Sequence, residues 1–128
     1  AVVADCGYSS IWDIFASELD KRFNLPTFPV LYMANTMARL RAGYDLREGN
    51  TVEYVAQSSL PILFIHGAAD DFVPVSMARK LYDAKAKGPK ELYIVPEAGH
   101  AEAKYKEPTT YYQKIFQFIQ DYGDGNKE

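Results

Sequence analysis

Residues 62–65, Ile-Leu-Phe-Ile, restrict the possible folds more than any other stretch of this chain. They form a continuous apolar run between Pro61 and Gly67. A strand with one wet face would alternate apolar and polar residues, whereas a strand of a parallel sheet is covered on both faces and is apolar throughout. The run therefore predicts a buried strand of a parallel sheet that has helices packed on both sides.

Two further short apolar segments predict strands, at residues 1–4 and 91–96. Helical patterns separate the segments, so the order is strand, helical insert, strand, helix, strand, helix. Right-handed crossovers then give an α/β fold with a parallel three-stranded sheet. The stretch from about residue 9 to residue 59 is much longer than a simple crossover, and we expect it to form a small helical cap over the strand ends.

Capping residues indicate where the first helices begin and end. Ser10 and Asp13 have the spacing of a capping box, and Pro26 ends the helix that follows. Gly43 is placed to terminate a second helix, which begins near Pro29. The apolar face expected for the first helix consists of Ile11, Ile14, Phe15, Leu19, Arg22 and Phe23.

Three later helices are also predicted. Asn50 and Glu53 offer a cap for a short one, and an apolar stripe from Met77 to Tyr82 indicates another. Pro108 suits the first position of a final helix, and the tail at residues 123–128 should fray. The apolar face expected for this final helix consists of Tyr111, Tyr112, Ile115, Phe116, Ile119 and Tyr122.

Composition excludes several classes of function. The net charge of −3 has interspersed signs, without the basic stripe that marks nucleic-acid binding. No apolar run approaches the about 20 residues that span a membrane. The single cysteine, Cys6, excludes an internal disulfide and offers no CxxC metal pair. We expect no nucleic-acid partner, no membrane segment, no metal and no cofactor, and a cytoplasmic location.

Titratable side chains follow all three predicted strands. Asp5 follows the first, Asp70 and Asp71 the second, and His100 the third. The carboxyl ends of parallel strands lie at one edge of the sheet, so these loops should converge. A carboxylate that holds one imidazole nitrogen leaves the other free to take a proton from a hydroxyl nucleophile. An acid and a histidine placed in this way indicate acid–base chemistry.

Three segments resemble the α/β-hydrolase superfamily. LFIHGAADDFVP (residues 63–74) is similar to its acid-bearing turn after the seventh strand, and VPEAGHAEA (95–103) to its histidine loop. ADCGYSS (4–10) resembles the end of its sixth strand, and the similarity is nearest to bacterial serine esterases and serine-peptidase-like members. The resemblance implies that residues 1–128 are a single partial α/β-hydrolase domain, the C-terminal portion, with 9–59 as a helical cap insert.

Position within these motifs implies the roles of the site residues. Asp70 matches the acid of the catalytic triad and His100 matches its base. The simpler alternatives are a turn acid for Asp70, an ordinary loop histidine for His100, and a turn or helix cap for Asp71. His66 is expected to be structural, with its ring bonded to backbone or to a loop acid. Asp5 is a minor alternative, since some members carry their acid after the sixth strand.

The serine nucleophile of the superfamily has no counterpart in this sequence. It sits in Gly-x-Ser-x-Gly, and none of the six serines here has those glycines. Cys6 precedes Asp70 and His100 in the right order, but Ala4 and Tyr8 stand where glycines are needed, so we interpret it as a structural thiol. The resemblance thus implies a serine hydrolase of esters, thioesters or amides that is longer than this chain, which alone should be inactive.

The expected partners follow from the same reasoning. They are a small ester or amide substrate and, at the edge strand of residues 1–4, either the missing N-terminal half of the fold or a second copy. The alternative function is a naturally truncated, non-catalytic binding module that uses the cap surface. Five cap residues either line an acyl or aromatic pocket or, more simply, pack the helices together: Trp12, Phe15, Phe28, Tyr32 and Met33.

Overall fold

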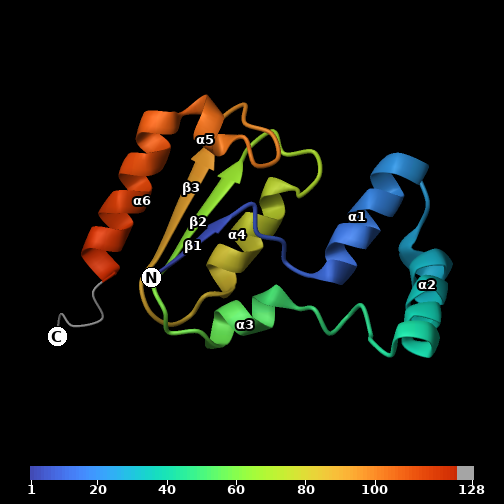
Figure 1. The fold of residues 1–128 in the computed structure, drawn as a ribbon. Helices are drawn as coiled ribbons and strands as arrows, with labels where there is room; N and C mark the ends of the chain where they lie inside the picture. The colour runs from blue at the N-terminus through green and yellow to red at the C-terminus, as the bar shows by residue number, and fades with distance from the viewer. Residues whose placement is uncertain (124–128) are drawn as a thin grey trace.

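Three parallel strands lie side by side in the order β1-β2-β3 (Figure 1). The computed structural model describes residues 1–123, so most of the tail that was expected to fray lies outside the described residues. The strands are β1 (Val2–Asp5), β2 (Ile62–Gly67) and β3 (Lys90–Val95). Their order and parallel pairing confirm the predicted sheet, and each strand lies within two residues of its expected ends.

Helices lie between and after these strands in the predicted order. One short helix, α5, was not expected. The bounds of the helices are α1 (Ile11–Phe23), α2 (Thr27–Ala42), α3 (Thr51–Gln57), α4 (Val75–Ala84), α5 (Ala103–Lys106) and α6 (Pro108–Tyr122).

Most of the predicted helix ends are confirmed. The Asp13 backbone N–H donates to Ser10 Oγ at 3.0 Å, and Gly43 ends α2 in the left-handed conformation with φ of 75°. Asn50 is the N-cap residue of α3 as predicted, but its side-chain amide donates to the Glu53 carboxylate at 2.9 Å and does not cap the backbone.

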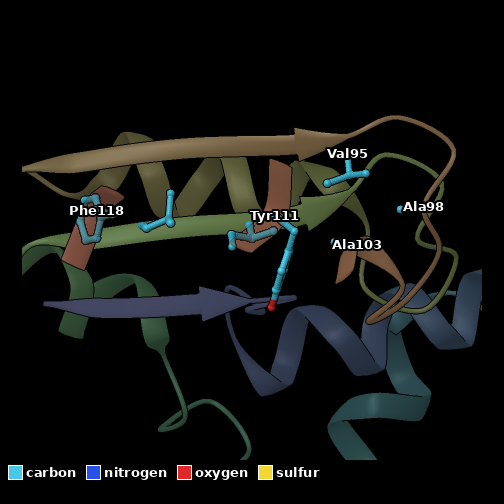
Figure 2. Close-up of a cluster of buried hydrophobic side chains, with 7 residues drawn as sticks. Val95, Ala98, Ala103, Tyr111 and Phe118 are labelled. Atoms are coloured by element: carbon cyan, nitrogen blue, oxygen red, sulfur yellow. The ribbon is translucent and has the colours of Figure 1, made fainter. Parts of the chain in front are cut away.

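Helices cover both faces of the sheet, and β2 is buried at every position. Leu63 and Ile65 face a cluster that includes Phe118 of α6, whereas Phe64 faces Leu81 of α4 on the opposite side. Figure 2 shows the first of these clusters, with Phe118 against the sheet. The interpretation of the continuous apolar run as an inner strand is therefore confirmed.

The predicted core face of α6 is partly wrong. The stripe that packs on the sheet has Tyr111 and Phe118 buried, with Ile115 and Tyr122 partly buried beside them. Three residues that were expected in the core are exposed: Tyr112, Phe116 and Ile119. Both stripes follow i, i+4, i+7 spacing, so periodicity alone does not distinguish the one that packs on the sheet.

Helices α1 and α2 lie apart from the sheet, beyond α4 (Figure 1). None of the residues of α1 is buried, so the apolar face expected for it does not enter the core. Two lysines tie α1 to the rest of the molecule: Lys21 Nζ donates to the Asp71 carbonyl oxygen at 2.9 Å, and Lys80 Nζ binds Asp13 at 2.9 Å. Among residues 1–123, no helix combines the length and apolarity needed to cross a membrane.

Phe118 and Phe116 provide a matched test of which stripe of α6 carries the core. Phe118 is 0% exposed and Phe116 is 67% exposed. Phe118→Ala should lower the free energy of unfolding by about 3–5 kcal/mol, because it removes a filled core volume. Phe116→Ala should change it by less than about 0.5 kcal/mol. Equal losses in chemical denaturation would contradict the assigned stripe.

Candidate active site

The loops that follow β2 and β3 are locked together at the carboxyl edge of the sheet. The Ala68 N–H donates to the Val95 carbonyl at 2.9 Å, and the Ala69 N–H donates to the Ala98 carbonyl at 3.0 Å. A Cβ atom on Gly67 would lie 2.2 Å from the Ala98 carbonyl oxygen, so no larger residue fits there without moving backbone. These contacts fix the start of the loop after β2 against the start of the loop after β3.

Asp70 uses its two carboxylate oxygens for different purposes. Oδ1 accepts the backbone N–H groups of Phe72 at 3.0 Å and Val73 at 2.8 Å, which closes the turn before α4. Oδ2 lies 2.9 Å from His100 Nδ1. The turn acid and the histidine partner were alternatives in the sequence, and the structure contains both contacts on one buried side chain.

His100 reaches Asp70 from the loop that follows β3. A carboxylate only accepts hydrogen bonds, so Nδ1 carries the proton and Nε2 is the nitrogen left for a reacting group. The side chain is 41% exposed, and the Phe72 ring packs edge-on against it at 5.2 Å between centroids. The predicted proximity of Asp70 and His100 is confirmed, and their catalytic role stays a prediction.

A second histidine also faces Asp70. His66 is fully buried, and its Nε2 donates to the Val73 carbonyl oxygen at 2.7 Å while lying 3.3 Å from Asp70 Oδ2. These are the backbone and acid contacts that were expected of it. Nδ1 of this ring is the one buried side-chain nitrogen or oxygen without a hydrogen-bond partner in the described part of the chain. Asp70 Oδ2 therefore lies between two imidazole rings, which the sequence did not predict.

Asp5 and Asp71 have other partners. The Tyr111 hydroxyl donates to Asp5 Oδ2 at 2.9 Å, and the Cys6 thiol donates to Asp5 Oδ1 at 3.2 Å. Burial and the bond to Asp5 raise the pKa of Tyr111 to about 12, so this hydroxyl keeps its proton at neutral pH. Asp71 lies in the turn between β2 and α4, where its backbone carbonyl binds Lys21.

Cys6 lies next to the two central residues of the site. It has a left-handed backbone with φ of 57°, and its Sγ accepts the Ala101 N–H at 3.2 Å. Burial raises the pKa of the Cys6 thiol to about 12, with Asp5 acting in the same direction and the Ala101 N–H opposing it. The thiol is therefore protonated at neutral pH, which agrees with a structural role and disfavours a cysteine nucleophile.

Cys6, Asp70 and His100 nevertheless form a group of metal-ligating types. One ligand atom from each lies within 4.8 Å of the others. The sequence offered no signal for this group, since Cys6 has no CxxC partner and lies 64 residues before Asp70.

Helix α2 carries a separate apolar groove of about 350 Å³, which it lines alone. Phe28, Tyr32 and Met33 line it, but Trp12 and Phe15 do not, so the acyl or aromatic pocket stays a prediction. Trp12 packs edge-on against Tyr32 at 5.1 Å between centroids, which is the helix packing that the other interpretation expected.

Sequence comparison relates the chain to one curated bacterial protein along nearly its whole length. It is 34% identical over 125 residues to the protein YqkD of Bacillus subtilis (strain 168), an alignment that covers 98% of this chain. The chain spans 41% of the length of YqkD.

Solved structures show the same fold at low sequence identity. An esterase from Pyrococcus furiosus matches with a TM-score of 0.64 and 18% identity, over 94% of this chain and 43% of the esterase. An acylaminoacyl peptidase from Pyrococcus horikoshii matches with a TM-score of 0.66 and 18% identity, over 98% of this chain and 20% of that one. The fold is therefore a portion of an α/β hydrolase. The model of the prolyl oligopeptidase family matches residues 9–125, and the chain belongs to that family.

Proposed function

We propose that Asp70 and His100 are the acid and the base of a serine hydrolase that cleaves ester, thioester or amide bonds. The observation that carries this proposal is the 2.9 Å contact between His100 Nδ1 and Asp70 Oδ2 at the carboxyl edge of a parallel sheet. Membership of the prolyl oligopeptidase family supports it, and so do an esterase and an acylaminoacyl peptidase among the proteins of similar fold.

Each residue has its own part in the proposed reaction. His100 Nε2 takes the proton of a serine hydroxyl as its oxygen attacks the substrate carbonyl, and then gives that proton to the leaving group. A water molecule repeats the sequence and releases the acyl group from the serine. Asp70 Oδ2 holds Nδ1–H throughout and stabilises the imidazolium that forms. The exposed ring of His100 gives a substrate access to Nε2, whereas Asp70 stays out of solvent.

The serine and the oxyanion-hole donors of this proposal belong to the longer protein. The 128 residues contain no Gly-x-Ser-x-Gly, and the chain spans 41% of YqkD. We therefore expect the 128-residue chain alone to leave p-nitrophenyl esters intact, since one oxyanion donor alone contributes about 2.7–4 kcal/mol to such a reaction.

In this proposal His66 is a positioning residue for Asp70. Its Nε2–H lies between the Val73 carbonyl and Asp70 Oδ2, so it holds the turn and the carboxylate in one arrangement. The ring is buried away from substrate and acts through Asp70.

The proposal also assigns a cap role to residues 9–59. Lys21 of α1 binds the backbone carbonyl of Asp71, which follows Asp70 in the chain. Movement of α1 would therefore shift the turn that carries Asp70. The α2 groove gives this cap an apolar surface for a binding partner or for packing.

The outer edge of β1 is the proposed site of a further strand. Val2 and Cys6 direct their N–H groups to β2, so Val3, of opposite parity, directs its own outward. An apolar edge with unpaired N–H and C=O groups invites pairing with another strand. We assign that strand to the longer protein or, in the isolated chain, to a second copy.

Removal of the acid or the base should abolish hydrolysis by the full-length protein. Asp70→Asn and His100→Ala should each lower kcat by about 10⁴-fold, because the imidazole loses its orientation or is lost. Asp71→Asn is the matched control and should retain activity, since Asp71 uses its backbone in the turn. Ester hydrolysis at saturating substrate measures all three. Unchanged activity in both of the first variants would refute the roles assigned to Asp70 and His100, whereas a full-length wild type without hydrolase activity would support the binding module instead.

Two substitutions of His66 separate positioning from simple packing. The Gln side chain can place an amide N–H near the position of Nε2, whereas Leu fills volume without a donor. His66→Leu should lower kcat by about 10²-fold, the cost of a misplacement of roughly 1 Å. His66→Gln should rescue most of that loss. The pH dependence of kcat/KM, which reports the base, should move in the Leu variant only. Equal behaviour in both variants would refute the positioning role.

The free edge predicts self-association of the isolated 128-residue chain. Light scattering should give a mass above that of a monomer at micromolar concentrations, because pairing satisfies the outer groups of β1. A Val3→Pro variant lacks the outward N–H and should remain monomeric. A monomeric wild-type chain whose Val3 amide exchanges slowly would show that the edge is protected in another way.

A further inference from the structure

We propose that Cys6, Asp70 and His100 bind a zinc-type divalent cation, and that the bound cation switches off the catalytic base. The three ligand atoms come from the loops after β1, β2 and β3, and all lie within 4.8 Å of one another. Sulfur, nitrogen and carboxylate oxygen are the three ligand types that zinc takes in proteins.

Two of the three atoms have nearly the spacing of a coordinated set, and the sulfur lies within 4.8 Å of both. Zinc–ligand distances of about 2.0–2.3 Å in a tetrahedral site place ligand atoms roughly 3.2–3.7 Å apart. His100 Nδ1 and Asp70 Oδ2 are already 2.9 Å apart. The His100 ring is 41% exposed, so it can shift to admit a cation and leaves a fourth position open to water.

Backbone hydrogen bonds orient two of the ligands from behind. The Ala101 N–H donates to Cys6 Sγ, and the N–H groups of Phe72 and Val73 hold the other oxygen of Asp70. Such outer contacts fix the direction of a ligand and stabilise the charge on a thiolate or carboxylate. The site therefore presents its ligands without rebuilding the three loops.

This ligand set selects among cations. Magnesium and calcium require six or more oxygen ligands or several waters, and only one carboxylate is present here. A thiolate and an imidazole favour zinc, cobalt or cadmium. Magnesium should therefore bind weakly at this position.

Coordination changes the protonation of two ligands. The Cys6 thiol loses its proton to solvent, and the thiolate sulfur bonds to the cation. The cation takes the Nδ1 lone pair of His100, so the single ring proton moves to Nε2. Nε2 then has no lone pair for a serine proton, and Asp70 Oδ2 binds the cation in place of Nδ1–H. The inhibition of His100 as a general base rests on the proposed function, whereas the binding of the cation rests on the geometry alone.

Cobalt titration of the full-length protein tests the binding without any catalytic readout. Added Co²⁺ should produce the near-ultraviolet absorption of a thiolate–cobalt bond, and Zn²⁺ should displace it. Cys6→Ala should abolish that absorption and weaken Zn²⁺ binding by at least about 100-fold, more than the loss of an outer-shell contact. Asp5→Asn is the matched control, because Asp5 touches Cys6 without belonging to the ligand set, and it should retain the absorption.

The outcomes separate the cation site from the proposed function. A missing absorption band in the wild type, or a band that persists in Cys6→Ala, would overturn the site. Zn²⁺ should inhibit ester hydrolysis by the wild type and by Asp5→Asn, with a midpoint that equals the binding constant and shifts at least about 100-fold in Cys6→Ala. Binding without inhibition would overturn the switch. Protein that binds cobalt but hydrolyses no ester after chelation would refute the proposed function and leave the site standing.

Discussion

The arrangement of the whole site depends on how the buried carboxylate of Asp70 is satisfied. A carboxylate removed from water is costly unless hydrogen bonds replace its hydration. Here two backbone N–H groups serve Oδ1, while His100 and His66 approach Oδ2. The same side chain therefore shapes the turn after β2 and orients the exposed histidine. The turn contacts and the contact with His100 do not compete for this residue, because each uses a different oxygen.

The sequence predicted the sheet and the meeting of Asp70 with His100 for a simple physical reason. The continuous run at residues 62–65 is compatible with burial on both faces and thus with a parallel sheet. In a parallel sheet all strands end at one edge, so residues that follow different strands are brought together whatever their distance in the chain. These arguments need only the order of the strands, and local apolar patterns are enough to predict that order.

Other features could not be predicted, because local sequence patterns do not show which way a helix face or a loop side chain points. Helix α6 has two apolar stripes of equal spacing, and contact with the sheet decides that Phe118 is buried and Phe116 exposed. The position of the Cys6 sulfur beside His100 depends on left-handed backbone at Cys6 and Ala101, with φ of 57° and 56°. Neither residue is a glycine, so nothing in the sequence marked these conformations.

The close approach of Gly67 to the Ala98 carbonyl has a consequence for how this protein can diversify. The loops after β2 and β3 contact each other where they leave the strands, so a change of length in one would have to be matched in the other. The side chains of α1 have no such restriction, since none of its residues is buried and two lysine contacts join it to the acid-bearing turn and to α4. Variants of this protein would then differ more readily in the exposed side chains of α1 than in the length of either loop.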